Sequence, residues 1–253
     1  MIDAHVSFSK PYSKEVLMEY IEEAKKVGID ELYVIEPSFK FLEFGLLYNE
    51  IRTMYPCQED WYCRLKKQSI KEYHAFISAM RKETFDIKVR FGLCISYLAQ
   101  HEQWMREIKE QFDYDIFIAS IDFIDNIAFA WGEDSDKMLW NKYNTNYLYR
   151  RYYETMNALL TSNLFDGVSG FDRIKVSRHT PTYHMKHTYH KLAKLLHEHH
   201  MYVEDGTSIH YFDHHPDYGL SDVFKQHCID EKVEIKKASL AIQPKDVARD
   251  FQM

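Results

Sequence analysis

The residues best suited to chemistry follow predicted strands, where several strand ends would converge on one barrel mouth. His5, Cys94 and Asp122 carry an imidazole, a thiol and a carboxylate, and this combination suits a zinc ion. A buried cysteine also serves commonly as a small hydrophobic residue, and a histidine beside a carboxylate often forms only a hydrogen-bonded pair. The three residues therefore predict either a site for one metal ion or an ordinary polar cluster.

A second polar group follows a later predicted strand. It consists of Glu204, Asp205, Thr207 and Ser208. Carboxylate and hydroxyl groups at the end of a barrel strand face the loops that form binding sites, so this segment predicts contacts with a polar ligand. Asp205 is accordingly a candidate substrate-binding residue.

Ten of the 14 histidines lie between His179 and His215, a density that suggests a metal site. Helical spacing argues against one, because the predicted helix 186–200 has its buried stripe on one face and its histidines on another. The buried residues are Tyr189, Leu192, Ala193 and Leu196, and the solvated ones are His187, His190, Lys194 and His197. We expect a solvated surface here rather than a metal centre.

Composition and missing motifs exclude several classes of function. A net charge of -7 leaves no overall basic field, so nucleic acid is not the expected partner. No apolar run approaches 18 residues, which predicts no membrane span. Four cysteines without a CxxC pair predict reduced thiols and a cytoplasmic location. Nucleophile-elbow, P-loop and dinucleotide glycine motifs do not occur.

The scaffold is predicted from a repeated alternation of short apolar strands and amphipathic helices, which indicates a parallel sheet covered by helices. In the first unit Ser13 is placed to cap a helix and Gly28 to end it, and Pro244 opens a last short helix. Seven strands favour a distorted (β/α)7 TIM-like barrel, one domain over residues 1–253, with a doubly wound sheet as the alternative. The predicted strands are residues 2–6, 31–36, 88–97, 114–123, 167–172, 201–208 and 233–240.

Residues 37–68 are predicted to be an irregular connection rich in aromatic side chains. Such side chains usually belong to a core. We expect this segment either to cap the barrel or to form the contact surface of a homo-oligomer.

The ends of these strands resemble the PHP superfamily, and within it the histidinol-phosphatase family, along almost the whole chain. The framework residues that carry the resemblance are Asp3-Ala4-His5, Gly92-Leu93 with Tyr97, Ser120 with Phe123-Ile124-Asp125, Leu164-Phe165-Asp166 before Asp172, Thr207-Ser208, Ser239, Ala241 and Pro244-Lys245-Asp246-Val247. The resemblance implies a PHP-type barrel and hydrolysis of a phosphate monoester by two or three divalent ions such as Zn, Mn or Fe.

The metal ligands that the resemblance implies are largely replaced. His5 is retained, and Glu36 stands where the family's second strand ends in Glu-His. The family's other ligand positions hold Ser7, Pro37, Cys94, Asp122, Gly170, Leu240 and Ile242. The remnant site therefore comprises His5, Ser7, Glu36, Cys94 and Asp122. Arg150 and Arg151 are similar to a family segment that contributes a phosphate-binding arginine, and they also fit a pair of surface charges on a helix.

Two functions follow from this pattern. The first is a catalytically impaired pseudoenzyme or binding protein, with a small phosphorylated ligand, because Pro, Gly, Leu and Ile offer no side-chain donor to a metal. The alternative is an active metal-dependent histidinol-phosphate phosphatase that uses an altered metal site built on His5, Cys94 and Asp122.

Overall fold

A sheet of seven parallel strands forms the centre of the structure, a computed structural model that describes residues 1–251. The strand order is β1-β2-β3-β4-β7-β8-β9. Val6 forms a parallel bridge with Ala241, and the Ser7 N–H donates to the Ala241 carbonyl over 2.9 Å. The sheet is thus a nearly closed barrel, as predicted, and not a doubly wound sheet. Its strands are β1 (Ile2–Val6), β2 (Glu31–Pro37), β3 (Lys88–Ser96), β4 (Ile116–Ser120), β7 (Gly167–Val168), β8 (Tyr202–Gly206) and β9 (Ile235–Ala238).

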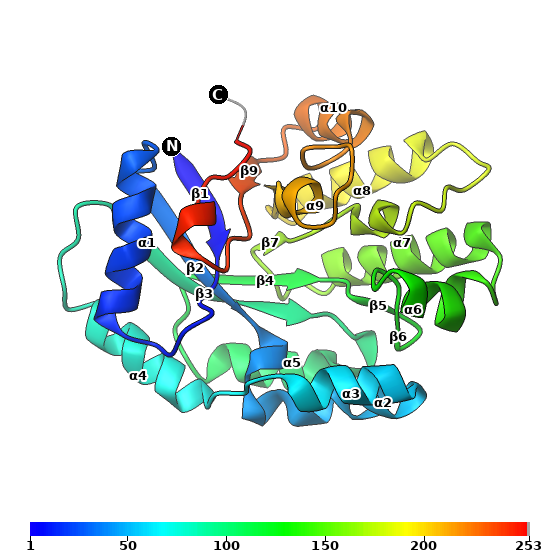
Figure 1. Ribbon diagram of the computed structural model, residues 1–253. Helices are drawn as coiled ribbons and strands as arrows, with labels where there is room; N and C mark the ends of the chain where they lie inside the picture. Colours follow the sequence, from blue (N-terminus) through cyan, green and yellow to red (C-terminus); the bar gives the residue numbers. More distant parts are fainter. Residues whose placement is uncertain (252–253) are drawn as a thin grey trace.

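Helices surround this sheet (Figure 1). The described helices are α1 (Lys14–Lys26), α2 (Asn49–Met54), α3 (Pro56–Arg64), α4 (Ile70–Met80), α5 (Glu102–Glu110), α6 (Glu133–Ser135), α7 (Thr145–Thr161), α8 (Lys186–Glu198), α9 (Ser208–Tyr211) and α10 (Asp222–Asp230). Short 3-10 turns connect several of them, and a π-helical turn covers Asp136–Trp140. Because each crossover returns the chain to the same end of the sheet, the carboxyl ends of the strands share one mouth.

The first unit shows how local sequence sets this arrangement. The Ser13 hydroxyl accepts a hydrogen bond from the Val16 N–H over 3.2 Å at the start of α1. Gly28 follows the helix with φ +77°, a conformation that glycine adopts without strain. Both predicted boundaries are confirmed, and the chain leads directly from the helix into β2.

The prediction of an irregular connection over residues 37–68 is wrong. The segment contains α2, α3 and a 3-10 helix over Leu42–Tyr48. Phe44, Leu47, Tyr48 and Ile51 are all buried in the main core, and their spacing is helical. The segment therefore packs against the barrel as part of its core. A homo-oligomer contact stays a prediction, which sedimentation would test.

The strand predicted over residues 114–123 ends earlier, at Ser120, and a small hairpin follows it. Its strands are β5 (Phe123–Ile124) and β6 (Ile127–Ala128). Asp125 and Asn126 connect them with φ of 48° and 65°, which a two-residue hairpin turn requires and which Asp and Asn tolerate. Helix α4 was not predicted, although its apolar residues recur at helical spacing.

The predicted strand over residues 167–172 is wrong in length, because β7 covers two residues only. Gly170 has φ +62°, which turns the chain out of the sheet directly after the strand. A Cβ on Gly167 would lie 2.7 Å from the Tyr202 ring, so glycine permits the close contact between β7 and β8. The short helix opened by Pro244 is confirmed as a 3-10 turn over Pro244–Asp246.

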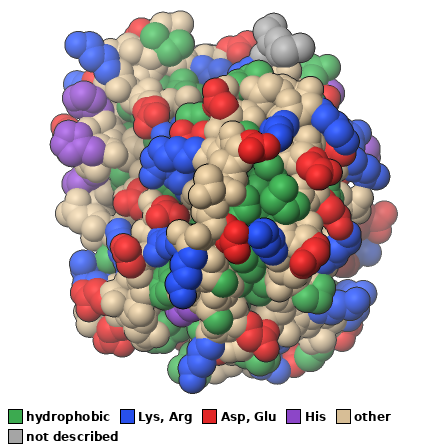
Figure 2. All heavy atoms as spheres, turned by 90° about the vertical axis from the view of Figure 1, so that its left-hand side faces the viewer, with side chains coloured by type: hydrophobic (Ala, Val, Ile, Leu, Met, Phe, Trp, Pro, Cys, Tyr) green, Lys and Arg blue, Asp and Glu red, His purple; other side chains and the backbone are tan. Residues whose placement is uncertain are grey.

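Three features bear on the expected surroundings of the protein. No helix among residues 1–251 is long and apolar enough to cross a membrane. On the face shown in Figure 2, acidic and basic side chains are interspersed and form no continuous basic patch. The four cysteines are unpaired. The cytoplasmic location stays a prediction.

Candidate functional site at the barrel mouth

A cavity of about 590 Å³ opens at the carboxyl ends of the strands. Four of the five residues of the remnant site line it, namely His5, Ser7, Cys94 and Asp122. They come from β1, from β3 and from the segment after β4. We call this cavity the mouth. Its position agrees with the expectation that reactive groups follow barrel strands.

His5 is paired with the buried carboxylate of Glu204, which lies 199 residues further along the chain. Its Nδ1 lies 3.0 Å from one oxygen of Glu204 and 3.2 Å from the other. Both side chains are almost fully buried. Burial alone would lower the pKa of His5, but the adjacent Glu204 carboxylate outweighs it, and the pKa is raised above its usual value. The imidazolium form is therefore favoured when no ion is bound. The pair uses Nδ1 only and leaves Nε2 without a hydrogen-bond partner among the described residues, so the bond to Glu204 does not by itself prevent His5 from binding a metal.

Asp122 is held by hydroxyl groups. Its Oδ2 accepts hydrogen bonds from Ser96 Oγ over 2.6 Å and from Ser120 Oγ over 2.9 Å. The Tyr48 hydroxyl in turn donates to Ser96 Oγ over 3.0 Å. This series of hydrogen bonds connects Tyr48, in the segment after β2, to Asp122 in the mouth. Both serine hydroxyls donate to the same oxygen, Oδ2, so the other carboxylate oxygen does not take part in these bonds.

Cys94 lines the mouth with a thiol whose surroundings favour the protonated form. It is buried, and its pKa is raised well above the usual value, first by burial and then by the carboxylates of Glu204 and Asp122. Metal binding and nucleophilic attack both need the thiolate. The side chain therefore fits the hydrophobic interpretation better than the metal-ligand one.

Glu36 does not line the mouth and lies behind its wall. One of its oxygens accepts the Phe8 N–H over 2.7 Å, and the other accepts Lys40 Nζ over 2.6 Å. The Glu36 side chain has no exposed surface. The carboxylate thus fastens the loop after β1, and the structure excludes it from the cavity surface.

Sequence reasoning overlooked the basic residues that follow β7. Arg173 lines the mouth, and its guanidinium lies 3.7 Å from the Asp213 carboxylate, beyond hydrogen-bond distance. Neighbouring Asp172 accepts Lys175 Nζ over 3.0 Å and the Ser221 N–H over 2.8 Å. These bonds attach the loop after β8 to the mouth. Arg173 could have been found as a cation directly after a strand end.

The structure places the three weaker substrate-binding candidates away from the mouth. Arg151 forms an ion pair with Asp125, at 2.6 Å, on the outer surface of α7. Arg150 lines a different cavity. Asp205 accepts the Leu220 N–H over 2.7 Å and pairs with Lys225 at 3.0 Å. None of the three lines the mouth.

The histidine-rich segment behaves as predicted on α8, where the buried stripe is confirmed. His190 is the exception to a purely solvated face, because it is half-buried and its Nδ1 lies 3.4 Å from Glu231. Within residues 1–251 no three His, Cys, Asp or Glu side chains are arranged to share a metal ion. The same holds for His5, Cys94 and Asp122.

Comparisons with known proteins bear on the resemblance inferred from the sequence. No family model matches the chain. The chain is 29% identical over 125 residues to the probable histidinol-phosphatase of Deinococcus radiodurans, a match that spans 47% of this chain and 46%, about half, of that protein.

Two solved structures share the fold over nearly the whole chain. A Listeria monocytogenes protein assigned as the histidinol phosphatase HisK superposes with a TM-score of 0.78 at 12% identity, covering 98% of both chains. The Lactococcus lactis histidinol phosphate phosphatase, complexed with zinc, L-histidinol and phosphate, gives 0.64 at 14% identity and covers 96% of this chain and 87% of that one. The chain has a histidinol-phosphatase-like fold. The resemblance to this family is confirmed.

In this histidinol-phosphatase-like barrel, every position that the resemblance assigns to a metal ligand lines the mouth. The set is His5, Ser7, Pro37, Cys94, Asp122, Gly170, Leu240 and Ile242. Gly170 lies two residues after the short strand β7 and lines the mouth with the others. Four of these residues offer no side-chain donor. Of the other four, Ser7 offers only a hydroxyl, His5 and Asp122 are hydrogen-bonded inside the protein, and burial favours the thiol form of Cys94. The side chains present do not fit a cluster of divalent ions.

Proposed function

We propose that this histidinol-phosphatase-like barrel is a catalytically impaired pseudoenzyme that binds a small phosphorylated ligand at its mouth. The observation that carries the proposal is the composition of the mouth. Proline, glycine, leucine and isoleucine occupy four of the positions assigned to metal ligands, and all four line the cavity. His5, the one retained ligand, pairs through Nδ1 with Glu204 and is a single donor where the family holds several.

The loss of donors removes the chemistry that the family's metal ions supply. Hydrolysis of a phosphate monoester requires a water whose pKa is lowered from about 15.7 towards 7, together with positive charge on the transferring group. No described side chain at the mouth replaces an ion cluster in the first role. The mouth therefore supports binding rather than metal-assisted hydrolysis.

Ligand binding is supported by the size and charge of the mouth. A volume of about 590 Å³ lies in the range of small-molecule sites. Lys40 and Arg249 also line it but have carboxylate partners within hydrogen-bond distance, whereas the partner of Arg173 lies 3.7 Å away. Arg173 is accordingly the cation that we assign to a phosphate group. The Lactococcus structure contains histidinol and phosphate, which makes histidinol phosphate the first ligand to test.

Activity measurements with untagged protein test the loss of hydrolysis. Histidinol phosphate and p-nitrophenyl phosphate are offered with Mn, Zn, Fe or Mg, and metal content is determined by elemental analysis. We expect turnover at the level of the protein-free blank and less than one metal ion per chain. Turnover abolished both by a chelator and by His5→Ala would instead establish the alternative, an active phosphatase with an altered metal site.

Calorimetric titration with histidinol phosphate tests the binding. We expect binding that weakens about tenfold or more in Arg173→Gln, because a charge-assisted hydrogen bond is lost. Arg151→Gln is the matched control, since its guanidinium lies on the outer surface of α7 and should leave the affinity unchanged. Equal affinities in all three proteins would contradict the assignment of Arg173.

A further inference from the structure

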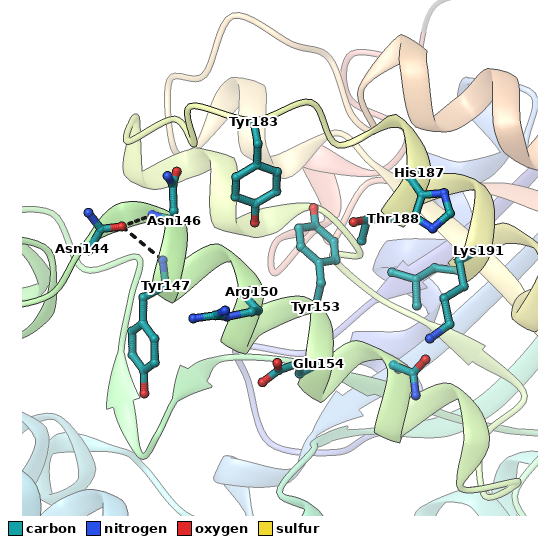
Figure 3. Close-up of a pocket in the computed structure, with 12 residues that line it drawn as sticks. Asn144, Asn146, Tyr147, Arg150, Tyr153, Glu154, Tyr183, His187, Thr188 and Lys191 are labelled. Atoms are coloured by element: carbon teal, nitrogen blue, oxygen red, sulfur yellow. Dashed lines mark hydrogen bonds between the residues drawn. The ribbon is translucent and has the colours of Figure 1, made fainter.

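A second cavity, of about 880 Å³, lies outside the barrel between α7 and the segment that leads into α8 (Figure 3). None of the residues that line it lines the mouth. We call it the α7–α8 cavity. It is therefore a separate hollow, and nothing in the proposed function involves it.

Two cations on facing helices line this cavity without a carboxylate partner. Arg150 comes from α7 and Lys191 from α8, and neither forms an ion pair with any described residue. Arg151, one residue further along α7, pairs with Asp125 and with Glu154. Glu154 is the one acidic residue that lines the cavity, and Arg151 compensates its charge. The cavity thus has an excess of positive charge.

Aromatic rings flank the cations. Arg150 lies 5.9 Å from the centre of the Tyr147 ring. Tyr147 and Tyr183 are about a third exposed, at 36% and 39%, which is unusual in a chain whose other aromatic residues are mostly buried. Figure 3 shows Tyr183 pointing from the loop before α8 towards α7. A planar group in the cavity would contact these rings.

The walls are held in place, whereas several polar groups inside are unused. The Asn146 amide donates to Thr182 Oγ1 and accepts the Thr182 N–H, both over 2.8 Å, which ties α7 to the loop. The side chains of Asn157 and Thr188 line the cavity and form no hydrogen bond with any described residue. A ligand would therefore meet a formed wall with free donors.

We infer that the α7–α8 cavity binds a small aromatic anion, a planar ring that carries a phosphate or carboxylate group. The anionic group would contact Arg150 and Lys191 and accept hydrogen bonds from Asn157 and Thr188. The ring would pack against Tyr147 and Tyr183. The volume lies within the range of sites for such molecules.

Phenylphosphonate, which combines a ring with a phosphate-like dianion that phosphatases do not cleave, is the probe. We expect Arg150→Gln and Lys191→Gln each to weaken its binding about tenfold, whereas Arg150→Lys retains most of the affinity. Arg52→Gln is the control, because Arg52 pairs with Glu59 and does not line the cavity, so the affinity should be unchanged. Thermal unfolding of each variant confirms that it is folded.

Three further probes distinguish the contribution of the anionic group from that of the ring. Benzoate tests a carboxylate in place of the phosphonate, inorganic phosphate tests the anion alone, and benzyl alcohol tests the ring alone. We expect phenylphosphonate or benzoate to bind more tightly than either part. The inference is overturned if no probe binds at millimolar concentration, or if Arg173→Gln weakens phenylphosphonate binding while Arg150→Gln does not, because the probe then occupies the mouth.

Discussion

The mouth and the α7–α8 cavity differ in how their polar side chains are satisfied. In the mouth, charged groups have partners inside the protein, as in the His5–Glu204 pair and in Asp122 with its two serine hydroxyls. In the α7–α8 cavity, Arg150 and Lys191 have none among the described residues. Only the mouth contains the positions that the resemblance assigns to metal ligands.

This difference shows two ways in which a site can change on one scaffold. The mouth keeps the shape of a site, and partners inside the protein satisfy polar groups such as His5 and Asp122, because a buried unpaired group is costly. The α7–α8 cavity is exposed, so water satisfies its cations and no internal partner is required. Substitutions in the mouth should therefore affect stability, whereas substitutions in the α7–α8 cavity should affect binding alone.

The largest expected effect comes from breaking the His5–Glu204 pair. In Glu204→Gln the histidine loses the carboxylate that favours its charged form, and removing one partner of a buried ion pair costs about 3–5 kcal/mol. Urea unfolding would measure the change. Glu154→Gln, on the surface of α7, is the control and should change the free energy of unfolding by less than about 0.5 kcal/mol. A change of less than about 0.5 kcal/mol in Glu204→Gln as well would contradict the view that internal pairs in the mouth stabilise the fold.

The same pair predicts how stability depends on pH. The pKa of folded His5 is raised above the unfolded value of about 6.5, because the Glu204 carboxylate outweighs the effect of burial. A raised histidine pKa contributes stability that is fully present below the unfolded pKa and is lost as the pH rises through the folded pKa.

Unfolding free energies measured from pH 6 to pH 9 test this dependence. We expect the wild type to lose stability upward from pH 6.5, and the difference between the wild type and Glu204→Gln to shrink over the same interval. Comparison of the two proteins removes the contribution of other groups that titrate in both. A difference that is constant with pH would show that His5 is not charged in the folded protein.

An intermediate effect is expected at Asp122. Replacing it with alanine leaves the hydroxyls of Ser96 and Ser120 without their acceptor, and each lost charge-assisted hydrogen bond is worth about 1.5–3 kcal/mol before water enters. Since Asp122 is only partly buried, we expect a net loss of about 1–2 kcal/mol in urea unfolding. Asp60→Ala, at an exposed position of α3, is the control. Stabilisation by the Asp122 substitution would show that the carboxylate is strained rather than satisfied.

The barrel could be predicted from sequence because its signal is repeated and local. Apolar strands alternate with capped helices, so the prediction survived errors in single elements such as the overlong strand over residues 167–172. The helices of residues 42–64 were not predicted, although Phe44, Leu47, Tyr48 and Ile51 have helical spacing. The prediction for this segment was based on its aromatic content and not on the helical spacing of its apolar residues.

The sequence predicted which residues lie at the mouth, but it did not predict which of them contact one another. Strand ends identify His5, Cys94 and Asp122 as mouth residues, and all three line the cavity. That His5 pairs with Glu204, 199 residues away, depends on how the barrel closes. The α7–α8 cavity gave no sequence signal, because it depends on how a loop after β7 packs against α7. Arg150 was noticed only through the family resemblance, and the structure places it in this other cavity.

The smallest expected effect on stability comes from the α7–α8 cavity. Arg150 has no ion pair to lose, so Arg150→Gln should change the free energy of unfolding by less than about 0.5 kcal/mol. If the excess positive charge of the cavity is unfavourable in the absence of a ligand, the variant should be slightly more stable at low salt. That gain should vanish as salt shortens the screening length. Urea unfolding at 10 mM and about 500 mM NaCl compares the two conditions. A destabilisation of more than about 1 kcal/mol would mean that Arg150 has a structural partner and that the contrast between the cavities does not hold.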